Sequence, residues 1–90
     1  MTRIELHNSA SWQDYDNLHR QMEAVGFSRK ILGNDGVWYK LPSAEYNLST
    51  TLTYEQVRDL AKGCADMIAK PNSVLVCEYT NAAWSNLVRV

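Results

Sequence analysis

The segment FSRKILGNDGVWYKLPSAEYNLSTTL, residues 27–52, decides the fold. Ser28–Gly33 has the composition of an edge strand, and the Asn-Asp-Gly sequence after it favours a tight turn with positive-φ residues. Val37–Leu41 is extended and aromatic. After an interruption at a proline, Glu45–Leu52 alternates between polar and apolar residues, which is typical of a half-buried strand. The segment therefore predicts a hairpin whose second arm is a central strand of a sheet.

The flanking segments predict one further strand and one helix on each side. Thr2–His7 alternates with period two, as a strand does. Ser11 with Asp14, and Thr53 with Gln56, have the spacing of capping boxes at the start of two helices. An apolar stripe runs along the first helix from Trp12 to Val25, spaced by three or four residues.

The resulting order of elements indicates the fold class. Ser73–Thr80 is the last and most hydrophobic strand, which makes the order strand, helix, strand, strand, helix, strand. This order predicts an α+β, ferredoxin-like βαββαβ domain with an antiparallel sheet of order 4-1-3-2 and two helices on one face. Ninety residues form a single domain, 1–90, in which 81–90 is a tail with a helical turn or a short strand.

Composition and charge exclude several classes of function. The net charge is −1, so any binding of nucleic acid depends on a local basic patch. No apolar run approaches the roughly 20 residues that span a bilayer, and we expect a cytoplasmic protein. Cys64 and Cys77 are separated in sequence and show no zinc-ligand spacing with the two histidines. Without a glycine-rich phosphate loop or a metal signature, we expect neither a small-molecule cofactor nor a metal.

Residues 27–52 resemble the corresponding region of the GhoS family, the antitoxin endoribonucleases of type V toxin–antitoxin systems. The resemblance rests on Phe27-Ser28, Gly36, Leu41, and the closing Thr50 and Leu52, which fall in matching places without gaps. It implies a ferredoxin-like protein, similar to the small nucleases of CRISPR systems, that cleaves single-stranded RNA internally, with a toxin mRNA as target. The family's activity is linked to an arginine on the first helix.

The position of that arginine is occupied here by His19, with Arg20 directly after it. RNA cleavage without a metal needs a base, an acid and a cation, and histidine suits the first two roles because its pKa is near neutrality. His7 and His19 are thus the candidate acid–base pair, with Arg20, Arg29 or Lys30 as the candidate cation. The alternative is that both histidines are ordinary surface residues.

The hairpin and the first strand supply the candidate contacts to RNA. The candidates are basic or aromatic: Arg3, Arg29, Lys30, Lys40 and Trp38. Charges on an edge strand also prevent aggregation, and the tryptophan could instead cover the core or a dimer contact. Two functions therefore stay open. One is a GhoS-like protein that binds or cleaves single-stranded mRNA; the other is a non-enzymatic ferredoxin-like module that forms a homodimer or binds a protein.

Overall fold

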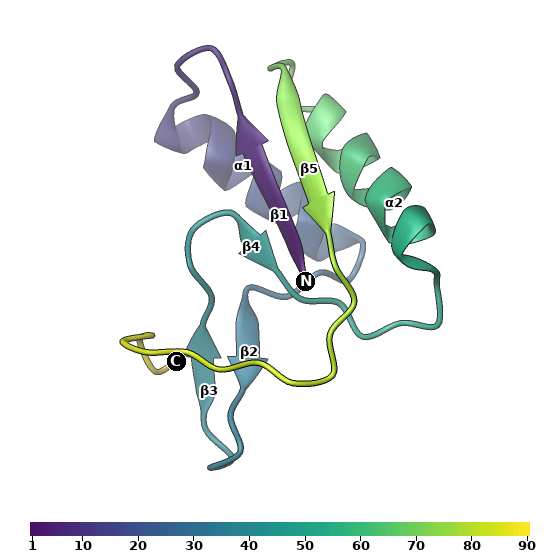
Figure 1. Ribbon diagram of the computed structural model, residues 1–90. Coiled ribbons are helices and arrows are strands. Elements are labelled where there is room, and N and C mark those ends of the chain that lie inside the picture. The colour runs from purple at the N-terminus through teal and green to yellow at the C-terminus, as the bar shows by residue number, and fades with distance from the viewer.

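The computed structural model describes residues 1–90 and contains two helices and five strands (Figure 1). In chain order the elements are β1 (Thr2–Leu6), α1 (Trp12–Ala24), β2 (Lys30–Leu32), β3 (Trp38–Lys40), β4 (Glu45–Tyr46), α2 (Tyr54–Asp66) and β5 (Asn72–Val76). Neither helix is long and apolar enough to cross a membrane. The predicted α+β class, with two helices and antiparallel strands, is confirmed.

The strands form two antiparallel sheets, so the prediction of a single sheet of order 4-1-3-2 is wrong. One sheet has the order β4-β1-β5, and the other pairs β2 with β3. The predicted strand over Glu45–Leu52 is reduced to two residues. In its register Thr2 lies opposite Tyr46. After Tyr46 the chain pairs on its other side, because Asn47 exchanges its backbone hydrogen bonds with Ser28.

A single β-bridge joins the two sheets. The backbone N–H groups of Ser28 and Asn47 each donate to the other residue's carbonyl oxygen at 2.7 Å. The hairpin itself turns over three residues, with Gly33 N–H donating to Val37 O at 2.8 Å. Among the three turn residues only Gly36 has a positive φ, 77°, so the turn needs one left-handed residue, at the glycine.

Both helices lie on one side of the β1–β5 pair, as Figure 1 shows. Their predicted capping boxes are confirmed at Ser11 and at Thr53. The core between helices and sheet consists of ten buried residues: Ile4, Leu6, Leu18, Met22, Phe27, Tyr46, Val57, Ala61, Cys64 and Ala65. Trp12 is 78% exposed, which the predicted stripe did not anticipate. Trp12 is the first residue of α1, whereas His19, seven residues later and on nearly the same side of the helix, is buried.

Candidate nucleic-acid interface

One face of the hairpin carries two lysines and a tryptophan. Lys30 lies directly opposite Lys40, and Leu32 lies directly opposite Trp38. Because side chains alternate along a strand, these four share one face, and the intervening Ile31 is buried on the other. All four are exposed.

The C-terminal tail widens this face. Lys40 N–H donates to Val88 O at 2.8 Å, and Val90 N–H donates to Trp38 O at 3.0 Å. These bonds place Val88 and Val90 beside β3, on the same face as Lys40 and Trp38. We call the surface formed by Lys30, Leu32, Trp38, Lys40, Val88 and Val90 the lysine face.

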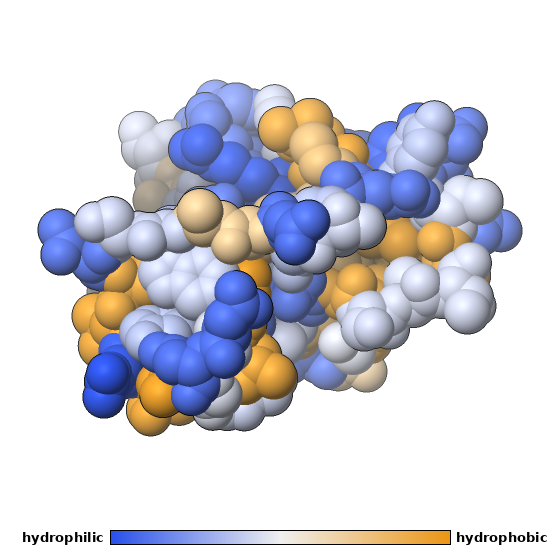
Figure 2. Space-filling view, turned by 60° about the horizontal axis from the view of Figure 1, so that its bottom comes forward, coloured by the Kyte–Doolittle hydropathy of each residue, from blue (hydrophilic) through white to orange (hydrophobic).

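The surface around the hairpin mixes apolar and charged side chains. In Figure 2, which turns the hairpin end of the molecule forward, orange and blue residues lie next to one another. A shallow hollow of about 340 Å³ on the lysine face is lined by Ser28, Lys30, Trp38 and Val90. The sequence predicted two of these residues as RNA contacts. The valine was missed, because pairing between the tail and β3 joins residues about fifty positions apart.

The two lysines have no acidic partner. The four close contacts between basic and acidic side chains involve other basic residues: His7, Arg20, Arg58 and Lys62. Like charges directly opposite each other on an antiparallel pair destabilise the pair. A bound anion between the lysines would remove that repulsion, so the lysine face is electrostatically suited to a phosphate.

The other two predicted RNA contacts lie elsewhere. Arg3 points to the exposed face of the three-stranded sheet, where its register places it opposite Glu45. Arg29 precedes Lys30 and faces the opposite way, and its charge contributes to lowering the pKa of His19. The structure therefore gathers Lys30, Lys40 and Trp38 on one surface and separates the two arginines from it.

His19 is a core residue. It is 8% exposed, and its Nδ1 atom is hydrogen-bonded to the Tyr46 hydroxyl at 2.6 Å. Burial lowers the pKa of His19, and the nearby charge of Arg29 lowers it further. A neutral, buried imidazole of this kind joins α1 to β4 and is closed to a substrate in this conformation.

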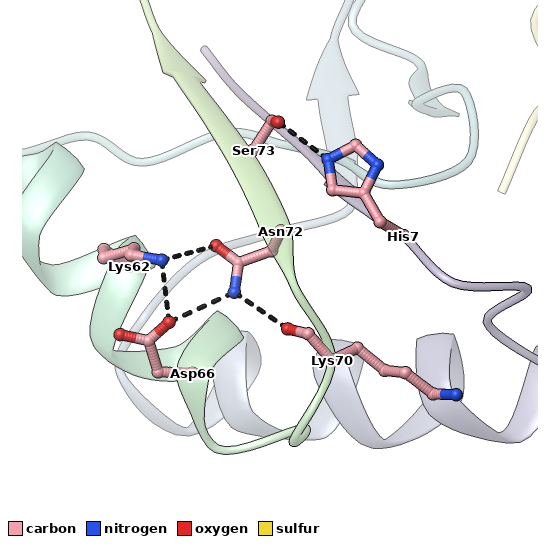
Figure 3. Close-up of polar contacts among 6 residues, drawn as sticks. All are labelled: His7, Lys62, Asp66, Lys70, Asn72 and Ser73. Atoms are coloured by element: carbon pink, nitrogen blue, oxygen red, sulfur yellow. Dashed lines mark hydrogen bonds and ion pairs between the residues drawn. The ribbon is translucent and has the colours of Figure 1, made fainter.

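His7 lies on the exposed side of the three-stranded sheet. Its Nε2 atom is 2.8 Å from Ser73 Oγ, and its Nδ1 atom is 3.4 Å from a carboxylate oxygen of Glu5. Figure 3 shows Ser73 directed toward His7, whereas the preceding Asn72 is directed toward Lys62 and Asp66. Thus the side chains of these neighbouring β5 residues point to opposite sides of the sheet.

The structure does not bring the three catalytic candidates together. His7 and His19 lie on opposite faces of the sheet, and Arg20 is exposed on α1, where it pairs with Asp16 at 3.0 Å. No three side chains of the His, Cys, Asp and Glu types converge as ligands for a metal ion. Of the predicted sites, the lysine face is the one in which several candidates meet.

Comparison of the chain with protein-family models, curated proteins and solved structures gave no match. The resemblance to the GhoS family therefore stays a prediction from the residues of the hairpin segment.

Proposed function

We propose that the protein is a GhoS-like RNA-interacting protein that binds single-stranded RNA on its lysine face. The observation that carries the proposal is the pair Lys30 and Lys40, opposed across the hairpin without an acidic partner and adjacent to an exposed Trp38. Cations that contact phosphates, next to an aromatic ring on which bases stack, are the usual combination in proteins that bind single strands.

We infer in addition that the fold is a ferredoxin-like βαββαβ arrangement with an inserted hairpin. The order β4-β1-β5, and the bridge from Ser28 to Asn47 beyond β4, support this inference. In it, the residues next to Phe27 act as the second strand, and β2 and β3 extend away from the sheet.

Cleavage of the bound RNA, with a toxin mRNA as the target of an antitoxin, is the enzymatic part of the proposal. His7 is its candidate general base, because it is the accessible one of the two histidines. To reach it, the RNA has to extend from the lysine face to the exposed face of the three-stranded sheet, and the Ser73 hydroxyl has to release Nε2. Proton transfer by such a group contributes about 10²–10⁴-fold to a rate. Arg3, on the same face of β1, is the nearest candidate in sequence for stabilising the phosphorane.

Binding is tested by fluorescence anisotropy with labelled single-stranded RNA at several salt concentrations. The Lys30→Ala/Lys40→Ala variant should bind more weakly, and the slope of log K against log salt should fall by about 1.4, corresponding to two lost phosphate contacts. A Lys62→Ala/Lys70→Ala variant changes the net charge equally and should keep the slope. Equal slopes for wild type and the first variant would refute the assignment of the lysine face.

Cleavage is tested separately with end-labelled RNA, in EDTA and in Mg²⁺. The proposal expects internal cuts that His7→Ala reduces at least a hundredfold. A His19→Gln variant serves as the matched control and should cleave like wild type. Intact RNA under both conditions would remove the enzymatic part and leave the binding part standing.

A dimerisation module is the second candidate function. The observation in its favour is that Leu32, Trp38, Val88 and Val90 are exposed on one surface. Apolar side chains gathered in this way are typical of contact surfaces between proteins. Sedimentation measurements decide the point: a dimer that Trp38→Ala or deletion of Asn81–Val90 converts to a monomer supports the module, and a monomeric wild type refutes it.

A further inference from the structure

We propose that the groove between the hairpin and the C-terminal tail binds an unpaired nucleobase of the RNA held on the lysine face. This inference rests on the proposed function and adds to it a second, base-reading site. The groove has a volume of about 460 Å³, within the range of small-molecule sites. Its lining combines three aromatic residues with three amides: Trp38, Tyr79, Trp84, Asn34, Asn47 and Asn81.

One aromatic wall of the groove, Trp84, is held by a contact with the hairpin. The ring of Trp84 packs against that of Tyr39 on β3, with centroids 5.4 Å apart. The tail reaches this position by crossing the hairpin, as Figure 1 shows. Flat faces held in place in this way offer stacking surfaces to any base.

The amides supply the polar groups that read the edge of a base. The Tyr79 hydroxyl donates to Asn47 Oδ1 at 2.7 Å, which orients that amide and leaves its Nδ2 protons available as donors. Asn81 Nδ2 donates to Thr80 Oγ1 at 3.5 Å, which leaves its Oδ1 atom as an acceptor. A hydrogen-bond donor and an acceptor in one groove match the edge of a nucleobase, which carries both donors and acceptors. A purely apolar ligand would leave the two amide groups without hydrogen-bond partners.

The groove and the lysine face meet at one residue. Trp38 lines both the groove and the shallow hollow beside Lys30. A strand whose phosphates lie between Lys30 and Lys40 can therefore place a neighbouring base past Trp38 into the groove. Inorganic polyphosphate can bind to the lysines but has no base to insert into the groove. Competition with polyphosphate therefore distinguishes binding at the lysines from binding in the groove.

The test compares labelled octamers of adenylate, uridylate and cytidylate, with inorganic polyphosphate as competitor. Wild-type protein should bind one homopolymer more tightly than the others. Asn34→Ala and Asn81→Ala, both at exposed positions, should each weaken the preferred complex about fivefold, corresponding to one lost hydrogen bond. In both variants the slope of log K against log salt should stay unchanged. Replacing Asn17, an exposed residue on α1, by alanine should have no effect on RNA affinity.

Stacking provides a measurement that needs no variant. RNA containing 2-aminopurine should lose fluorescence on binding, and polyphosphate should displace the RNA. Equal affinity for all three homopolymers, or unchanged affinity in both asparagine variants, would overturn the base-reading site. If binding then still depends on Lys30 and Lys40, the proposed function stands without it; if no RNA binds, both fall.

Discussion

Removal of the Tyr46 hydroxyl should destabilise the protein, because that hydroxyl is the partner of a buried histidine. Tyr46 is completely buried, and its oxygen is 2.6 Å from His19 Nδ1. In Tyr46→Phe the ring stays in place, with its edge-to-face contact to Phe27, and only the hydrogen bond is lost. The effect therefore measures the bond between α1 and β4 rather than core packing.

The expected loss follows from the burial of the group left behind. An unsatisfied buried nitrogen costs about 1–3 kcal/mol. For a domain of 60–100 residues, each kcal/mol corresponds to about 4–8 °C in the midpoint of thermal unfolding. Tyr46→Phe should thus lower that midpoint by at least about 4 °C. Urea unfolding at pH 7.5, followed by circular dichroism, gives the free-energy change directly.

The same pair makes stability depend on pH. Burial lowers the pKa of His19 in the folded state below its ordinary value of 6.5, so the unfolded chain takes up the proton first as the pH falls. The contribution of the neutral histidine is complete above pH 6.5 and is lost progressively as the pH falls toward the lowered pKa. The free energy of unfolding should therefore decrease as the pH is lowered from 7.5 to 5.

His19→Gln is the matched variant for this pH effect. It keeps a hydrogen-bonding side chain but does not titrate, so its unfolding free energy should change less with pH than that of wild type. Two results would refute the reasoning: a loss below 0.5 kcal/mol in Tyr46→Phe, or the same pH slope for wild type and His19→Gln.

Three further predictions concern local structure. Thr53→Ala removes the N-cap of α2 and should cost about 1 kcal/mol in urea unfolding, whereas Thr53→Ser should restore most of it. Asp35→Ala removes acceptors for Val37 N–H at 2.9 Å and the Tyr39 hydroxyl at 2.7 Å, so hairpin amides should exchange faster by NMR. The Tyr39 hydrogen bond lowers the pKa of Asp35, so wild-type protection should persist below pH 3.8 and disappear only at lower pH. Gly36→Ala places a side chain at φ 77° and should destabilise the protein by about 1–2 kcal/mol, although the space around it is open; unchanged unfolding would contradict this.

The candidate site could be predicted only in part. Alternation along a strand identifies which residues share a face, so the sequence was sufficient to separate Arg29 from Lys30. It was not sufficient to place Lys40 opposite Lys30, because the register depends on a turn with one left-handed residue at Gly36. His19 was expected to be accessible, yet it is buried and hydrogen-bonded to Tyr46, a contact between residues 27 positions apart that no helical pattern predicts.

The sequence by itself determined the local elements: both capping boxes, the alternation of β1 and the position of the hairpin, because these depend on residues a few positions apart. Only the tertiary structure decided how they combine. β4 pairs with β1 over only two residues and the next residue, Asn47, bridges to Ser28, so one expected sheet becomes two. The pairing of Val88 and Val90 with β3 completes the lysine face, and the crossing of the tail forms the groove. Both depend on contacts between distant residues, which no local pattern encodes.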